Sequence, residues 1–155
     1  MKLIKFFLKM LIFTPAKIFA TIFFGYEKLV SQVFPQLHAE MRQDLIDVID
    51  NDFREVKHPN NKQLIKFKLY TPNKICAYRY RTFSTKEPEM LDWIDEYGGE
   101  GTFYDIGANV GIYSIYYAKA KTGKVISFEP SVFNLRQLAK NISVNGLENS
   151  ISIVP

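Results

Sequence analysis

Two acidic residues in the second half of the sequence stand where a nucleoside-binding protein needs them. Asp105 ends the short apolar segment 102–106, and a loop follows with glycines at Gly107 and Gly111, where a side chain would block a ligand lying against the backbone. Glu129 directly follows a second apolar segment, 124–128. An ionised carboxylate accepts two hydrogen bonds and matches the vicinal hydroxyls of a ribose. These residues therefore predict a nucleoside site with the ribose on Glu129.

The elements that position these residues alternate between strand and helix. The expected order is a strand at 102–106, a helix at 110–119, a strand at 124–128, a helix at 132–144 and a strand at 151–154. Short connections between such elements indicate parallel βαβ units, in which ligands bind at the carboxyl ends of the strands. A right-handed crossover places the first two strand ends side by side, so the two carboxylates are expected to be neighbours.

The loop helps to separate two cofactors that fit such a crevice. A dinucleotide requires G-x-G-x-x-G so that its pyrophosphate can sit on a helix N-terminus. Here Asn109 lies between Gly107 and Gly111, and Ile112 stands where the third glycine would be needed. Asp105 would repel pyrophosphate but attract the ammonium group of a methionine moiety. The loop favours S-adenosyl-L-methionine and leaves a nicotinamide-dependent oxidoreductase as a weaker alternative.

The sequence from about Lys86 to Pro155 resembles the amino-terminal portion of an FkbM-type S-adenosylmethionine-dependent methyltransferase domain. The resemblance rests on several short motifs, namely 105–111, Tyr113-Ser114, Phe128-Glu129-Pro130, Asn141-Ile142 and Asn145-Gly146-Leu147. The upstream Glu87-Pro88-Glu89 and Trp93-Ile94 are similar to the lead-in helix of that family. The resemblance implies a Rossmann-like class I methyltransferase fold of the α/β class. It also implies methyl transfer to an oxygen of a sugar or another small hydroxylated metabolite.

The resemblance also implies roles for individual residues in binding the cofactor. Asp105, Gly107 and Gly111 would contact its methionyl end, Ala108 and Asn109 would line the loop, Glu129 would hold the ribose, and Pro130 and Ser131 would flank the adenine. No catalytic residue and no metal ligand is assigned. We expect His38 and His58, the latter in a loop, to be surface or packing residues and Cys76, inside a strand, to pack as a small apolar residue. Glu87 faces the substrate or caps a helix.

The chain departs from the class I pattern in its number of strands. Class I domains normally have seven, whereas this chain ends at Pro155, the end of the third expected strand. We expect the fold to be truncated there and favour a fragment of a longer protein over a natural truncation, with the activity belonging to the parent. The alternative is a membrane-associated or partner-binding module with a vestigial Rossmann half.

Composition excludes several other classes of protein. The chain has 155 residues and a single cysteine, so it can form neither an internal disulfide nor a four-cysteine zinc site. Residues 1–30 hold five lysines and one glutamate, which accounts for the whole net charge of +4. The remaining residues are neutral overall, so no basic domain for nucleic acid is expected.

The N-terminal segment 1–30 reads as a basic amphipathic helix with a kink at Pro15. Lys2, Lys5, Lys9 and Lys17 fall within one third of a helical wheel, opposite a set of apolar residues. The uncharged stretches 10–16 and 18–26 are shorter than the roughly 20 residues that a bilayer span needs. We favour a peripheral helix at a membrane surface in a cytoplasmic protein. A helix covering the protein's own core or a partner, and a cleaved or spanning signal, remain as alternatives.

Residues 31–100 are expected to form a lead-in to the domain at 101–155. The apolar spacing predicts a helix over 36–56, strands at 64–70 and 75–83 paired as a hairpin through a turn at Pro72, and a helix from Pro88 to Gly98. Met90, Leu91, Trp93 and Ile94 are expected to form the buried face of that last helix.

Overall fold

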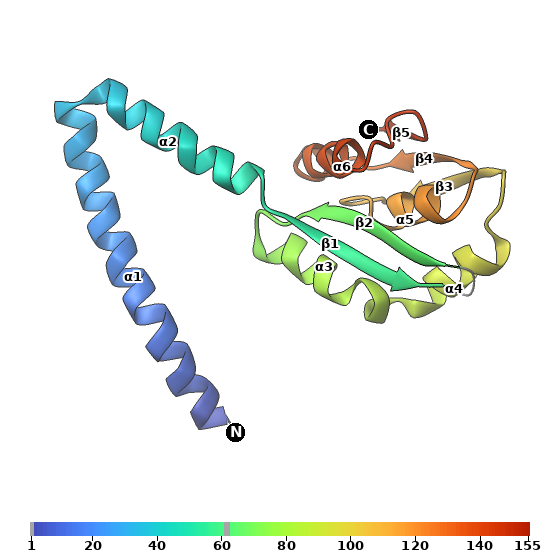
Figure 1. The fold of residues 1–155 in the computed structure, drawn as a ribbon, viewed down its shortest axis with the longest axis horizontal. Helices are drawn as coiled ribbons and strands as arrows, with labels where there is room; N and C mark the ends of the chain where they lie inside the picture. Colours follow the sequence, from blue (N-terminus) through green and yellow to red (C-terminus); the bar gives the residue numbers. More distant parts are fainter. Residues whose placement is uncertain (1, 61–62) are drawn as a thin grey trace. The chain divides into compact units, whose positions relative to one another are not determined.

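A computed structural model describes residues 2–60 and 63–155, with side chains from residue 13 onwards. The described chain separates into two compact units, Met1–Val48 and Ile49–Pro155 (Figure 1). The sequence predicted three parts, 1–30, 31–100 and 101–155, and this division into two units does not test that prediction.

The first unit is a pair of helices, α1 (Lys2–Val33) and α2 (Pro35–Asp50). Pro35 opens α2, where its fixed φ suits the first helical turn. Glu27 on α1 ties the two helices together, because its carboxylate lies 3.1 Å from His38 Nε2 and 3.7 Å from Arg42 Nε. α1 continues through Pro15 as one helix. Among the described residues, no helix has both the length and the apolarity to cross a membrane.

The hairpin of the lead-in is built from a different pair of segments than the sequence predicted. β1 (Phe53–Pro59) pairs antiparallel with β2 (Leu64–Tyr70), whereas the predicted second strand, 75–83, lies within the helix α3 (Lys74–Lys86). The Asn73 side chain caps α3 by accepting the N–H groups of Ile75 and Cys76, both at 3.0 Å. The helix predicted over 36–56 ends at Asp50 instead. Phe53 and Val56 are three residues apart, a spacing that also fits a helix and conceals the strand.

The remaining elements follow the predicted alternation of strand and helix. They are α4 (Pro88–Tyr97), β3 (Thr102–Ile106), α5 (Ile112–Ala120), β4 (Lys124–Phe128), α6 (Val132–Val144) and β5 (Ile151–Val154). The last three strands form a parallel sheet in the order β3-β4-β5. The predicted α/β class, with a three-stranded parallel sheet behind a helical and hairpin lead-in, is therefore confirmed. On α4 only Leu91 and Ile94 are fully buried, and Trp93 is exposed, contrary to expectation.

The hydrophobic core surrounds α5, which contacts both the parallel sheet and β2 of the hairpin. Five of its nine residues are buried, among them Ser114, Ile115 and Tyr116 with no exposed surface, so this helix lacks a solvent-facing side. The hairpin and the sheet thus share one core and belong to one folding unit.

Asn141 of α6 and Asn145, the C-cap residue of that helix, attach the hairpin to this core. The free edge of β2 donates the Tyr70 N–H to Asn141 Oδ1 (2.6 Å) and the Lys68 N–H to Asn145 Oδ1 (2.8 Å). Asn141 in turn donates to the Val110 carbonyl (2.8 Å), and Asn145 to the Lys68 carbonyl (2.8 Å). Side-chain amides therefore satisfy backbone groups that an edge strand leaves unpaired.

Candidate functional site

The predicted site residues gather at the carboxyl ends of β3 and β4. The two strands pair in register, with Ile106 opposite Phe128. The chain then folds back onto β4, because Gly107 and Ala108 both donate their N–H groups to the Phe128 carbonyl at 2.9 Å. This turn brings the loop that follows β3, residues 107–111, against the residue that follows β4, Glu129.

The loop holds three residues in the left-handed region of backbone space. The φ angles are 78° at Gly107, 55° at Asn109 and 80° at Gly111. Glycine adopts this region without strain. Other residues carry a steric cost there, and that cost is smallest for asparagine. The sequence marked both glycines, and the structure gives each a conformational reason.

The two glycines differ in what surrounds them. A Cβ atom at Gly111 would come within 2.3 Å of Leu138 Cδ1 on α6, so this glycine allows α6 to pack against the loop. A Cβ atom at Gly107 would meet nothing within 4 Å, and the backbone there borders open space. The space next to Gly107 is consequently where the loop can accept a ligand against its backbone.

Glu129 is buried, with 5% of its surface exposed, and its carboxylate accepts a hydrogen bond from the loop. Its Oε2 accepts the Asn109 N–H (2.7 Å), and its Oε1 accepts the Ser131 N–H (2.8 Å) and the Asn134 side-chain amide (3.2 Å). Burial raises the pKa of Glu129, but the donors from Ser131, Asn134 and Asn109 outweigh it and hold the pKa below its usual value. This carboxylate is therefore ionised at neutral pH and joins the loop to the start of α6.

These contacts restrict how Glu129 could hold a ribose. A carboxylate offers about four lone-pair sites, and the hydrogen bonds above use three of them. One site on Oε2 remains for a hydroxyl. A second hydroxyl would compete with the longest of the three bonds, the one from Asn134. Asn134, which the sequence did not single out, is thus part of the site.

Asp105 lies beneath the loop in a buried polar chain. Ser114 Oγ on α5 donates to Asp105 Oδ2 (2.5 Å) and lies 2.7 Å from Ser127 Oγ on β4. Ser114 has only one hydroxyl hydrogen, so Ser127 must donate to Ser114. Burial raises the pKa of Asp105, which is 7% exposed, even though the Ser114 bond opposes the shift. The environments of Asp105 and Glu129 therefore displace their two pKa values in opposite directions.

The other predicted residues border the same corner of the sheet. Ala108 is buried, Asn109 and Ser131 are partly buried, and Pro130 is exposed. The Ser131 carbonyl accepts the N–H groups of Asn134 and Leu135, at 3.0 and 2.9 Å, in the first turn of α6.

Glu87 lies between α3 and α4 and is the N-cap residue of α4, as the capping interpretation requires, but its side chain makes no capping hydrogen bond. Its carboxylate instead accepts the Tyr113 hydroxyl of α5 (2.9 Å) and pairs with Lys86. The hydrogen bonds from Lys86 and Tyr113 lower the pKa of Glu87, while burial and Glu87 raise the pKa of Tyr113. Tyr113, two residues beyond Gly111, is therefore neutral and donates to an ionised Glu87.

Arg79 on α3 is a charged residue that the sequence reasoning missed. Its Nε atom is buried and has no hydrogen-bond acceptor in the part of the chain that the structure describes. The positive charge of Arg79 lowers the pKa values of Glu87, Tyr113 and Glu129. It therefore acts on the carboxylates of Glu87 and Glu129. No signal in the sequence pointed to it, because the segment 75–83 read as a strand away from the site.

The histidines and the cysteine lie apart from the loop. His38 binds Glu27, and His58 lies in β1, not in a loop, with Nδ1 2.8 Å from Ser84 Oγ and its ring edge-on to Phe83. Cys76 is buried, as expected, but in a helix, where burial raises its pKa. Within residues 2–60 and 63–155, no three His, Cys, Asp or Glu residues are grouped as a metal site would require.

A pocket of about 310 Å³ lies elsewhere, between β1 and α3, with Glu55, Lys57, Arg81 and Ser84 in its lining. It contains none of the predicted cofactor residues. The carboxyl edge of the parallel sheet, not this pocket, is where the sequence motifs and the backbone geometry coincide.

Comparison with known proteins gives distant structural likenesses. No protein-family model and no curated protein matches the sequence. A solved structure from Pyrococcus horikoshii, described as a transferase, is similar over 80% of this chain and 48% of its own, with 18% identity and a TM-score of 0.44. The structure of P. horikoshii TYW2 in complex with MeSAdo is similar over the same shares, with 20% identity and a TM-score of 0.37. The chain thus spans about half the length of these two structures.

Proposed function

We propose that this chain forms the cofactor-binding part of an S-adenosylmethionine-dependent methyltransferase. The observation that carries the proposal is the open space at Gly107, a positive-φ glycine in the turn that joins the strand end at buried Asp105 to the strand end before buried Glu129. A nucleoside cofactor with a cationic methionyl end needs this combination: backbone without side chains, one carboxylate for the ammonium group and one for the ribose.

The residues of the chain would act by binding and alignment. S-adenosylmethionine supplies an activated methyl group on a sulfonium when it is bound. Methyl transfer is an in-line displacement, so the protein must hold the acceptor oxygen, the carbon and the sulfur in line and exclude water. Ionised Glu129 fixes the loop through Asn109, and it fixes the first turn of α6 through Ser131. Both contacts limit the movement of the surface on which the cofactor would lie.

The acceptor class proposed here rests on the resemblance of 105–111 and 128–130 to FkbM-type domains. It points to O-methylation of a sugar or another small hydroxylated metabolite. Arg79, Glu87 and Tyr113 are polar side chains that an acceptor beside the loop could contact, and all three lie outside the segments 105–111 and 128–130.

Two glycine substitutions test the cofactor site. Gly107→Ala places a methyl group in the open space, and we expect S-adenosylmethionine to bind at least tenfold more weakly by calorimetry. Gly146→Ala is the matched control, because Gly146 also has a positive φ of 64° and open space around its Cβ position but follows α6 at its other end. Both substitutions should cost about 1–2 kcal/mol of folding stability.

Equal cofactor affinity in the two variants would remove Gly107 from the site. If the unsubstituted chain binds neither S-adenosylmethionine nor S-adenosylhomocysteine, the proposed function is wrong and a vestigial half-domain is favoured. NADH is tested beside them, as the ligand that an oxidoreductase would bind instead.

A further inference from the structure

The surface of α1 carries a continuous apolar face that nothing in the first unit covers. Six residues form this free face and are between 54 and 70% exposed: Ile18, Phe19, Ile22, Tyr26, Leu29 and Val33. At about 100° per residue they fall within an arc of roughly 100°. A monomer in water rarely leaves such a stripe open, so the free face indicates a partner.

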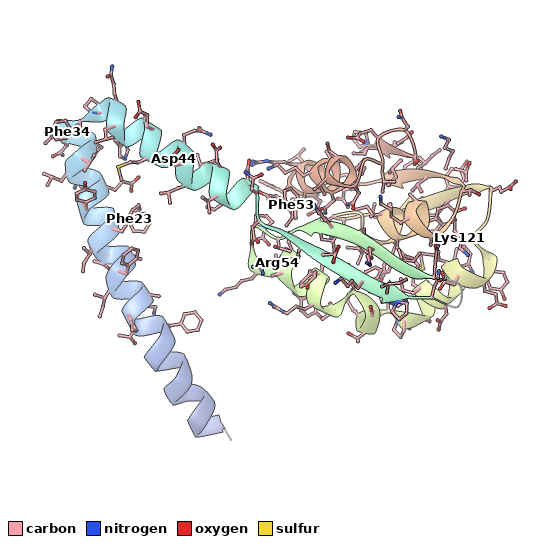
Figure 2. The ribbon with its side chains drawn as sticks, viewed as in Figure 1. Phe23, Phe34, Asp44, Phe53, Arg54 and Lys121 are labelled. Carbon is pink, nitrogen blue, oxygen red and sulfur yellow. The ribbon has the colours of Figure 1, made fainter. Side chains whose placement is uncertain are left out.

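The side of α1 that meets α2 is a different one. Val30 is 5% exposed, and Glu27 binds His38 and Arg42 of α2, whereas Phe23, labelled in Figure 2, is only partly exposed. These residues lie about 100° around the helix from the centre of the free face. α2 therefore leaves the free face unoccupied, and the two helices diverge away from their connection at Phe34 (Figure 1).

The charges around the free face are all of one sign along most of the helix. Residues 1–26 contain Lys2, Lys5, Lys9 and Lys17 and no acidic residue. By helical register the positions of these lysines fall outside the arc of the free face, and Lys17 and Lys28 lie roughly 130–150° from its centre. A helix with apolar side chains on one side and lysines on the other matches a layer whose interior is hydrocarbon and whose surface is anionic.

We infer that α1 lies in the surface of an anionic phospholipid membrane, with its free face among the acyl chains and its lysines at the headgroups. Tyr26 and Phe19 suit the boundary between headgroup and hydrocarbon. A second copy of α1 offers no acidic residue within 1–26 that could neutralise these lysines. Anionic lipid instead neutralises them, and this favours a membrane over self-association.

Flotation of the full chain with vesicles tests the inference without reference to methyl transfer. We expect the chain to float with vesicles of 70% phosphatidylcholine and 30% phosphatidylserine and much less with phosphatidylcholine alone. Binding should weaken at least fivefold between low and 0.5 M salt, because salt screens the lysine contribution. Carbonate at high pH should release the bound chain, since the helix does not span.

Two neutral substitutions two residues apart, on different sides of α1, test the orientation. Ile22→Ser removes an apolar side chain from the free face, and we expect affinity for the anionic vesicles to fall about tenfold or more. Phe24→Ser is the matched control, because Phe24 is equally exposed, at 63% against 66% for Ile22, but lies on the lysine side. It should lower the affinity less than threefold. Circular dichroism of both bound variants establishes that α1 is helical.

Several results would overturn the inference. Absence of flotation would exclude a membrane partner, and a dimer in sedimentation that Ile22→Ser dissociates would assign the free face to a second copy. Equal losses for the two variants would contradict the orientation. Resistance to carbonate would replace a surface helix with a spanning one.

Discussion

Asp105 and Glu129 show how two carboxylates of similar exposure acquire opposite properties. Asp105 accepts from the hydroxyl of Ser114 and has little else to offset its burial, so its pKa is raised. Glu129 accepts backbone and amide N–H groups from Asn109, Ser131 and Asn134, and these lower its pKa below the usual value despite burial. Burial outweighs the Ser114 hydrogen bonds at Asp105, whereas the three donors outweigh burial at Glu129, so the balance between burial and hydrogen bonding sets the direction of each shift.

The raised pKa of Asp105 predicts a stability that declines as the pH rises. An unfolded aspartate has a pKa of about 3.9. Between that pH and the higher folded pKa, the folded state binds more protons, so the free energy of unfolding falls as the pH increases. Asp105→Asn should remove this decrease in the free energy of unfolding. At pH 7 the variant should therefore unfold at a higher urea concentration than the unsubstituted chain, and the difference between their urea midpoints should disappear toward pH 4.

Cofactor binding by the same variant should move the other way and weaken at least tenfold, because the ammonium group loses its carboxylate. Asp92→Asn, at an exposed position on α4, provides the control. A gap in urea stability that stays constant from pH 4 to pH 7 would contradict the raised pKa.

The lowered pKa of Glu129 predicts the opposite slope. The charged form is favoured on folding, so its contribution is present above an unfolded pKa of about 4.3 and is lost as the pH falls through the folded value. Glu129→Gln should cost about 2–3 kcal/mol at pH 7, since an amide nitrogen cannot accept from Asn109 or Ser131. The cost should shrink below pH 4 in urea titrations, and a cost independent of pH would refute the charged network. Glu148→Gln, exposed beyond α6, is the control.

At the scale of elements, α6 serves both the candidate site and the hairpin. Its first turn receives Glu129 through Ser131 and Asn134, Leu138 packs on Gly111, and Asn141 and Asn145 hold β2. A shift of this one helix would therefore alter the loop and the hairpin together. The hairpin is for this reason structurally coupled to the candidate site.

Removal of the Asn141 side chain should measure this attachment. Asn141→Ala leaves the Tyr70 N–H and the Val110 carbonyl without partners in a fully buried place, and we expect a loss of about 2–4 kcal/mol. Asn149→Ala, exposed in the turn before β5, should change the free energy of unfolding by less than about 0.5 kcal/mol. Similar losses in the two variants would show that the bonds of Asn141 contribute little.

For the whole molecule, the second unit has the core that an independently folding part requires. Asp50 belongs to it, because this residue accepts the Tyr70 hydroxyl (2.6 Å) and pairs with Lys140 (2.9 Å) and Arg136 (3.3 Å). The same contact contributes, after burial, to the rise in the pKa of Tyr70 to about 12. One face of its sheet, however, stays open, with Tyr104 and Ile106 at 59% and 75% exposure.

A truncated chain of residues 49–155 is expected to fold, with a thermal midpoint within about 3 °C of the full chain. A chain of residues 51–155 lacks Asp50 and should unfold at a lower temperature than the 49–155 chain, because the Tyr70 hydroxyl and two cations lose their acceptor. Thermal unfolding followed by circular dichroism compares the two. A 49–155 chain without a cooperative transition would show that the first unit is needed for folding.

The sequence by itself determined the strand–loop–strand segment that carries Asp105, Gly107, Gly111 and Glu129. Its strands alternate with helices over short distances, and the loop glycines follow from local backbone geometry, so both are visible without tertiary contacts. The α/β class and the parallel order follow from the same local pattern.

Only the tertiary structure decided which segment pairs with β2, what Glu129 binds, and where Arg79 lies. The run 75–83 has the composition of a strand, yet the Asn73 cap begins a helix there, and the partner of β2 becomes 53–59. Gly111 differs from Gly107 because its Cβ position lies against Leu138, which is 27 residues further along the chain. Such contacts join residues distant in sequence, and their geometry depends on how the helices pack, which no local pattern encodes.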